Sequence, residues 1–263
     1  MSTETTPAGP GPAPQGQEPD RGSSRTALRL GVLAVIVVVV GGIAVVGLLQ
    51  SRQSTPQVSA TAATPTTIND GTGEQPWGVR YNSAPGKPTL AIWEDFQCPY
   101  CAQFEATDGA AVRALADAGK VNLVWRPTTF IDQGEGAQTG PHPRSSHRAT
   151  MAWGCAIDAG KGAEYHDLLF AQQAPPTQEG RGWSDQQLLD FATQVGISGD
   201  AKTAFDTCVS TKKYDSWATN SYAAFVSEAV PGTPAGFLDG TELTPAQLTD
   251  PASLAALVEK ATT

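Results

Sequence analysis

Apolar residues are distributed unevenly along the chain and divide it into four stretches. Residues 1–29 contain almost no large apolar side chain and are rich in Pro, Gly, Ser and Thr. Such a composition cannot bury a hydrophobic core, so we expect a disordered tail. Residues 30–49 are continuously apolar, and residues 50–74 are polar again. Only residues 75–263 combine apolar and polar positions in the patterns of strands and helices, which predicts one folded domain.

The continuously apolar stretch, residues 30–49, is long enough to cross a membrane. It contains twenty residues without a charged side chain. As a helix this stretch spans about 30 Å, the thickness of the hydrocarbon core of a bilayer. Arg21, Arg25 and Arg29 precede it, whereas only Arg52 follows it closely. The positive-inside rule therefore predicts a cytoplasmic N-terminus and an extracytoplasmic domain.

A cleavable signal peptide is the alternative interpretation of the same stretch. Ala60-Thr61-Ala62 resembles a cleavage site. However, secretory cores usually have about 7–15 apolar residues, and this site lies far beyond Leu49. We therefore expect an uncleaved single-pass anchor in the cell membrane, with residues 50–74 as a flexible extracytoplasmic linker.

The folded domain begins with a strand, helix and strand pattern. A short β-like run at residues 77–81 precedes an apolar strand at residues 89–95. A helix from about Pro99 to Ala118 follows, with apolar positions at three- and four-residue spacing, and then a strand at residues 121–125. Short connections between these elements predict a right-handed βαβ unit with parallel strands.

A mainly helical region, from about residue 144 to residue 229, follows a loop at residues 131–144. Its expected helical faces contain Met151, Ala152, Cys155 and Ala156 in one helix and Ala201, Ala204, Phe205 and Cys208 in another. Ser184 and Gln187 have the spacing of a capping box. A strand through Leu238, a hairpin turn at Asp239-Gly240 and a last helix from near Asp250 complete the pattern.

The charge and the remaining polar residues exclude several classes of function. The chain carries a net charge of −9 and has no basic patch, so we expect no nucleic-acid partner. His142, His147 and His166 are its three histidines, and none has the spacing of a metal ligand. We interpret them as surface or loop residues and expect neither a metal nor a cofactor.

The motif Cys98-Pro99-Tyr100-Cys101 directly follows the strand at residues 89–95 and opens the next helix. The first N–H groups of a helix have no intrahelical partner, so they stabilise a thiolate at Cys98, and Pro99 suits the first helical position. The pKa of such a cysteine is typically about 3.5–7.5. We therefore predict Cys98 as the nucleophile and Cys101 as the resolving thiol, with Pro99 and Tyr100 influencing the thiolate.

Two other interpretations of this cysteine pair stay open. Half of a zinc site would need two more ligands at close spacing, and Cys155 and Cys208 lie far apart in the sequence. A permanently closed structural disulfide seldom spans only two residues at a strand-to-helix junction. Reversible redox chemistry is the interpretation that we favour.

The order of elements and two motifs resemble a known family. Residues 95–101, Asp-Phe-Gln-Cys-Pro-Tyr-Cys, and Gly232-Thr233-Pro234 resemble motifs of the DsbA-like disulfide oxidoreductases, over about residues 77–263. The resemblance implies an α/β thioredoxin fold, a central mixed sheet flanked by helices, with an inserted all-helical subdomain. It also implies that Pro234 is a cis proline facing the cysteines and that Thr233 offers backbone groups to an extended substrate. An ordinary trans proline, or Pro231 in this role, is the alternative.

The resemblance also identifies one departure. Many thioredoxin-like enzymes have a buried acidic residue six positions before the first cysteine, where it helps to move the proton of the resolving thiol. Here that position is Ile92. Glu94 and Asp95 lie closer to Cys98 and could partly replace this acid, but we favour the interpretation that they are solvated residues at a strand end. Proton transfer at Cys101 is therefore left without an obvious partner.

The other two cysteines, Cys155 and Cys208, have two interpretations. As a structural disulfide between helices they would close a loop of about fifty residues. The chain-entropy model gives roughly 4 kcal/mol of stabilisation of the folded state for such a disulfide. As a second redox couple they would need a lowered pKa and exposure, which apolar helix faces do not provide. We expect the structural disulfide.

The expected function is that of a membrane-tethered thiol–disulfide oxidoreductase. It would donate the disulfide of Cys98 and Cys101 to exported cysteine-containing proteins and be reoxidised by a membrane partner. A reductase or isomerase using the same site is one alternative. A membrane-anchored chaperone or scaffold without catalysis is an alternative of another class.

Overall fold

The computed structural model describes residues 62–65, 77–134, 137, 139–173 and 182–262. The chain divides after Ser54 into two units, and all described residues belong to the second. The predicted tail and the apolar stretch at residues 30–49 lie outside the described residues, as does most of the linker. Within the described ranges, none of the helices has the length and apolar character needed to span a membrane.

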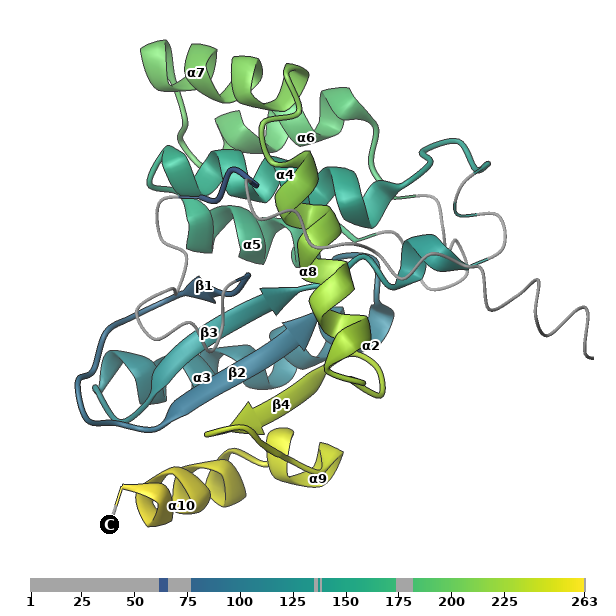
Figure 1. Ribbon diagram of the computed structural model, residues 1–263. Helices are drawn as coiled ribbons and strands as arrows, with labels where there is room; N and C mark the ends of the chain where they lie inside the picture. The colour runs from purple at the N-terminus through teal and green to yellow at the C-terminus, as the bar shows by residue number, and fades with distance from the viewer. Residues whose placement is uncertain (1–61, 66–76, 135–136, 138, 174–181, 263) are drawn as a thin grey trace, which may run out of the picture. The chain divides into compact units, whose positions relative to one another are not determined.

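The centre of the domain is a mixed sheet of five strands in the order β1-β3-β2-β4-β5 (Figure 1). The strands are β1 (Val79–Arg80), β2 (Thr89–Glu94), β3 (Asn122–Pro127), β4 (Ala235–Leu238) and β5 (Thr241–Glu242). Parallel pairing of β2 with β3 confirms the predicted βαβ unit. Antiparallel β4 lies on the other side of β2 and pairs Ala235 with Trp93. Residues 90–93 of the central strand β2 are buried, as their continuous apolar sequence predicts, and Glu94 at the end of the strand is buried as well.

The helix after the cysteine motif has a wide turn that the periodicity did not predict. It consists of α2 (Pro99–Phe104), a π-helical turn η1 (Glu105–Gly109) and α3 (Ala110–Asp117). A Cβ atom at Gly109 would lie 2.3 Å from Oε2 of Glu105. Glycine therefore leaves room for this carboxylate to fold back over the wide turn. Single π-helical turns of this kind are frequent at functional sites.

Within the described residues between β3 and β4, five helices form the insertion. They are α4 (Ser145–Asp158), α5 (Gly162–Ala171), α6 (Asp185–Gln194), α7 (Gly199–Ser210) and α8 (Asp215–Ser227), and a 3₁₀ turn η2 (Ile131–Gln133) precedes them. Figure 1 shows α4 to α7 grouped beyond one edge of the sheet, while α8 runs back toward β4. The capping box of Ser184 and Gln187 is present. The predicted apolar face of α7 is only partly right, because Ala201 and Ala204 are exposed and Phe205 alone is deeply buried.

The C-terminal part returns to the sheet through a hairpin. Asp239 and Gly240 both have positive φ, 46° and 76°, as a tight turn of this type requires. A short helix α9 (Pro245–Leu248), not expected from the sequence, precedes α10 (Pro251–Ala261). Leu254 and Val258 of α10 are buried, and Leu257 of the same helix is partly buried.

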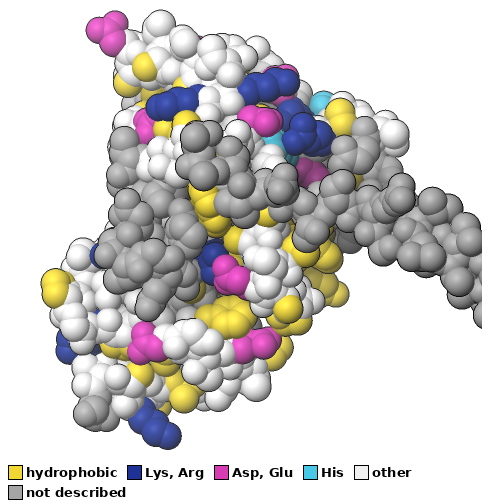
Figure 2. Space-filling view, in the orientation of Figure 1, with side chains coloured by type: hydrophobic (Ala, Val, Ile, Leu, Met, Phe, Trp, Pro, Cys, Tyr) yellow, Lys and Arg dark blue, Asp and Glu magenta, His cyan; other side chains and the backbone are white. Residues whose placement is uncertain are grey.

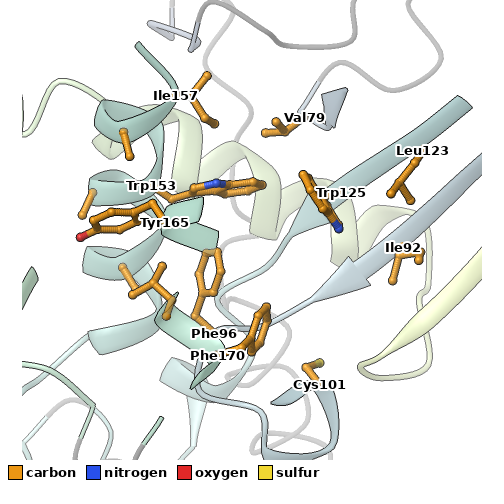
Figure 3. Close-up of a cluster of buried hydrophobic side chains, with 14 of the residues drawn as sticks. Val79, Ile92, Phe96, Cys101, Leu123, Trp125, Trp153, Ile157, Tyr165 and Phe170 are labelled. Carbon is orange, nitrogen blue, oxygen red and sulfur yellow. The ribbon is translucent and has the colours of Figure 1, made fainter. Parts of the chain in front are cut away.

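Aromatic rings join the sheet to the helical insertion. Figure 3 shows Trp125 of β3 facing Trp153 of α4, with Phe96 and Phe170 below them and Cys101 nearby. The ring centroids of Trp125 and Trp153 are 6.3 Å apart, and those of Phe96 and Phe170 are 5.1 Å apart. The insertion thus shares a continuous core with the sheet, and this core ends beside the cysteine motif. On the outer face drawn in Figure 2, acidic and basic side chains alternate over the insertion.

Candidate active site

The cysteine motif lies where the chain leaves β2 and enters α2. Cys98 is the N-cap of α2, with extended backbone angles, and Pro99 occupies the first turn. The carbonyl of Cys98 accepts hydrogen bonds from the N–H groups of Cys101 and Ala102, both at 3.1 Å. Cys98 and Cys101 are free thiols, so the structure shows the dithiol form of the pair.

The Gly-Thr-Pro loop lies directly opposite Cys98. The peptide bond between Thr233 and Pro234 is cis, and the thiol of Cys98 donates to the carbonyl oxygen of Thr233 at 3.3 Å. Pro234 rather than Pro231 therefore has the geometry that the resemblance implied. The Thr233 hydroxyl oxygen is buried and has no hydrogen-bond partner among the described residues.

The two thiols have opposite electrostatic environments. A hydrogen bond from the Cys101 thiol outweighs burial and, with backbone N–H groups of Cys101 and Tyr100, lowers the pKa of Cys98 to about 6. Burial raises the pKa of Cys101 well above its usual value, and the negative charges of Cys98 and Glu94 add to this effect. At neutral pH the pair thus holds one thiolate and one thiol.

Of the two sulfur-bearing residues, only Cys98 retains any exposure to solvent. Cys101 is fully buried and Cys98 is 4% exposed, whereas Tyr100 between them is 70% exposed. The side-chain amide of Gln173 donates to the carbonyls of Phe96 and Cys98, at 2.7 and 3.1 Å. This residue, from the segment that follows α5, therefore holds the loop that carries the nucleophile.

Asp95 is buried, contrary to the expectation of a solvated strand end. Its carboxylate accepts hydrogen bonds from the Ser146 hydroxyl at 2.5 Å and from the backbone N–H groups of Gln97 and Ile131. Burial raises its pKa to about 7. The Gln97 amide continues the network to Asp132, at 2.9 Å. The loop before Cys98 is thereby fastened to the N-terminus of α4.

Glu94 and two of the histidines also correct the sequence interpretation. Glu94 is 4% exposed, and its Oε2 lies 3.1 Å from Nε2 of His166, which is fully buried. His147 is buried as well and pairs with Asp215 at 3.0 Å, and only His142 lies partly exposed in a turn. Ile92, at the position of the missing acid, is an ordinary core residue. The local spacing of residues along the sequence carries no signal for these contacts, because the partners are 72 and 68 positions apart.

A metal site is the obvious test for the group of Glu94, Glu105 and His166. Their potential ligand atoms lie within 4.8 Å of one another. However, Arg113 already donates to Oε2 of Glu105 at 2.7 Å, and His166 faces Glu94. A divalent cation would meet a guanidinium there, so the group does not fit a metal.

A buried arginine near the Gly-Thr-Pro loop was not predicted. Arg126 of β3 is 2% exposed, stacks over Trp93 at 3.9 Å and makes two hydrogen bonds with Glu228, at 2.5 and 2.7 Å. Glu228 follows α8 and stands just before the loop that contains Pro234. The ion pair therefore fixes the chain segment that leads into the site.

The second cysteine pair is joined as a disulfide within the insertion. Cys155 of α4 and Cys208 of α7 have an S–S distance of 1.99 Å and a Cα–Cα distance of 5.9 Å. Cys155 is buried, Cys208 is partly exposed, and the bond borders a cavity of about 570 Å³. Figure 1 shows α7 at the end of the insertion remote from α2, so the two pairs occupy separate places.

Comparisons with known proteins agree with this architecture. MdbA of Actinomyces oris, a thiol-disulfide oxidoreductase, matches with 23% identity over 78% of this chain and 98% of its own, at a TM-score of 0.60. Reduced DsbA of Mycobacterium tuberculosis matches with 24% identity over 70% and 91%, at 0.54. BdbD of Bacillus subtilis matches with 16% identity over 76% and 98%, at 0.57. No curated protein sequence gives a significant match.

These likenesses confirm the predicted fold, a thioredoxin-type mixed sheet with helices as in DsbA-like proteins. A family model described as thioredoxin matches residues 82–260, which is more than half of the chain. The chain therefore belongs to the thioredoxin family.

Proposed function

We propose that this protein is a thiol–disulfide oxidoreductase that uses Cys98 as its nucleophilic sulfur. The observation that carries the proposal is the pairing of a low-pKa, marginally exposed Cys98 with a buried, high-pKa Cys101 opposite the Thr233–Pro234 bond. A purely structural pair or a scaffold needs neither the asymmetry nor the loop. The names of the structural neighbours, MdbA and DsbA thiol-disulfide oxidoreductases, support the same activity.

The reaction follows from this asymmetry. In the oxidised protein a substrate thiolate attacks the sulfur of Cys98, the Cys98–Cys101 bond breaks, and Cys101 leaves. The second substrate thiolate then attacks the substrate sulfur of the mixed disulfide, and Cys98 departs as a thiolate. Two electrons pass from the substrate dithiol to the cysteine pair, and the substrate gains a disulfide.

The direction that we propose is oxidation of the substrate. Stabilising the Cys98 thiolate stabilises the reduced protein, and a stable reduced form makes the disulfide form a stronger oxidant. We propose further that the substrates are exported proteins and that a membrane partner restores the disulfide. The apolar stretch at residues 30–49 and the three arginines before it support an anchored domain outside the membrane.

The decisive experiment is the redox equilibrium of the full-length protein with glutathione, with mass spectrometry to identify the cysteines that titrate. We expect Cys98 and Cys101 to titrate and Cys155 and Cys208 to stay joined. A potential close to that of a cytosolic reductant, about −270 mV for thioredoxin, would overturn the oxidant direction. Recovery of a scrambled disulfide-rich protein would instead favour an isomerase. If Cys98 and Cys101 never exchange with glutathione, the alternative of a scaffold without catalysis would be favoured.

A further inference from the structure

A second cavity lies in the helical insertion and is lined by neither cysteine pair. Its volume is about 370 Å³, and its walls are formed by α4, α6 and α7 and by the turns that precede α4 and α8. None of its described lining residues belongs to the Thr233–Pro234 loop. Cavities of this size are typical of sites for small molecules. The proposed exchange reaction does not use it.

The inner wall of this cavity is apolar. Met151 of α4 is 6% exposed and Leu188 of α6 is 1% exposed. Leu189 and Val209, which are partly buried, continue the same surface toward the rim. An apolar wall of this kind favours a ligand with an apolar part, because binding removes that part from water.

The acidic residues at the rim of the cavity already have partners. Asp185 pairs with Arg148, Asp206 with Lys202 and Asp215 with His147. Burial and the charge of Arg144 lower the pKa of His147, so its imidazole is neutral at pH 7. A neutral imidazole that faces a carboxylate with Nε2 donates a hydrogen bond through that nitrogen. These acids and their partners therefore leave no basic group of their own for a ligand.

Two other basic residues at the same rim, Arg144 and Lys212, have no such partner. Neither side chain makes an ion pair or a hydrogen bond with any residue that the structure describes. Both lie close enough to His147 for their charges to lower its pKa, so the two cations face one space. Figure 2 shows basic side chains beside a histidine on the surface of the insertion. The chain has a net charge of −9, so a general excess of basic residues does not explain this pair.

The backbone holds both of these cations in an unusual conformation. Arg144 has a φ of 52° and Lys212 a φ of 53°, in the left-handed region that residues with a Cβ atom seldom adopt. Four described residues other than glycine have a positive φ, and two of the four line this one cavity. Residues in such conformations cluster at ligand-binding sites. The placement of the two cations is thus maintained at a cost to the backbone.

We propose that this cavity binds a small organic carboxylate with an apolar body, such as a short-chain fatty acid. The carboxylate lies between Arg144 and Lys212, and the hydrocarbon chain extends toward Met151 and Leu188. A guanidinium matches a carboxylate through two parallel hydrogen bonds, and the lysine ammonium adds a further donor. The site is thus a binding site separate from the thiol chemistry.

The charge at the rim selects a ligand with a single negative charge. The carboxylates of Asp185, Asp206 and Asp215 lie at the same rim. A doubly charged phosphate would bring additional negative charge close to them, which is unfavourable. The apolar inner wall likewise disfavours a compact and strongly hydrated anion. A carboxylic acid with a hydrocarbon chain matches both the rim and the inner wall.

Met151 provides a local measurement of binding in the full-length protein. The chain contains two methionines, and the other one is Met1. Labelling the methionine methyl groups with ¹³C therefore gives two NMR resonances, and Met151→Leu identifies the one that reports on the cavity. Hexanoate is the probe, and hexanamide is its uncharged analogue. Butanoate has a shorter apolar body, and inorganic phosphate has none.

We expect hexanoate to shift the Met151 resonance until the site is saturated. Hexanamide should bind at least tenfold more weakly, because it lacks the charge. Butanoate is two CH₂ groups shorter and should bind about tenfold more weakly. Phosphate should leave the resonance in place at the concentration at which hexanoate saturates the site.

Substitution of the two cations tests their role directly. Arg144→Gln and Lys212→Gln should each weaken hexanoate binding by about five- to tenfold. Lys87→Gln is the matched control and should bind hexanoate as the unmodified protein does. Lys87 is also exposed and makes no side-chain ion pair with the described residues, but it lies in the turn before β2.

Several results would overturn the site. One is a Met151 resonance that hexanoate does not shift, and another is equal affinity for hexanoate and hexanamide. Phosphate that binds as tightly as hexanoate would overturn the apolar part of the ligand. Unchanged hexanoate affinity of the folded Arg144 and Lys212 variants would contradict the assigned cations. The comparison of probes uses the unmodified protein, so it decides the question even if a variant misfolds.

Discussion

The two cysteine pairs of this domain differ in their place in the fold and in the groups that surround their sulfur atoms. Cys98 and Cys101 lie at the start of one helix, opposite the Thr233–Pro234 loop, and their environment separates their pKa values. Cys155 and Cys208 are 53 positions apart and join two helices of the insertion. We therefore expect hydrogen-bond donors around the sulfur, rather than the presence of a cysteine, to decide which pair exchanges.

The largest effect that separates the pairs is expected from Cys98→Ser. Oxidation of a reduced dithiol peptide should fall by about 1000-fold or more, because the attacked sulfur is gone. The Cys155–Cys208 bond should stay intact in mass spectrometry, and the urea unfolding midpoint should stay close to that of the unmodified protein. Retained oxidation by this variant would assign the activity to the other pair.

The double substitution Cys155→Ala and Cys208→Ala should have the opposite effect. Opening a loop of 53 positions is expected to cost about 4 kcal/mol of unfolding free energy, because the unfolded chain regains entropy. Urea unfolding measures this change. The potential of Cys98 and Cys101 should not move. A shifted potential at unchanged stability would favour the interpretation as a second redox couple.

Alkylation of the reduced protein should show one reactive sulfur with a low midpoint. Because the pKa of Cys98 is lowered to about 6, its thiolate is present above that pH and is lost below it. The rate with iodoacetamide should be half-maximal near pH 6 and fall about tenfold per unit below. Cys101 should stay unlabelled at neutral pH, since burial raises its pKa. Equal labelling of both thiols would contradict the assigned asymmetry.

The smallest effect is expected from Tyr100→Ala, between the two sulfurs. The ring is 70% exposed, so the unfolding free energy should change by less than about 0.5 kcal/mol. The alkylation midpoint of Cys98 should also stay, because Tyr100 contributes a backbone N–H that alanine retains. The rate of reaction of the variant with iodoacetamide, followed against pH, measures this midpoint. A midpoint shifted by a full pH unit would mean that the side chain itself controls the thiolate.

The sequence alone determined most of the helices and strands and the place of the Cys98–Cys101 pair at the start of a helix. Continuous apolar runs predict β2 and β3, helical spacing predicts the insertion, and a cysteine pair directly after a strand predicts two cysteines at a helix start. These inferences succeed because hydrophobic periodicity, helix capping and the unpaired N–H groups at a helix start depend on only a few neighbouring residues. The two-residue spacing of Cys98 and Cys101 needs no tertiary information.

Only the tertiary structure decided which polar residues around that pair are buried and which partners they contact. Glu94 and Asp95 look solvated in the sequence because their partners, His166 and Ser146, are 72 and 51 positions away. His166 is likewise an unremarkable residue of α5 until the insertion folds onto β2 and β3. A buried charge is tolerated only where a partner meets it, and such meetings depend on long-range packing that local patterns do not encode.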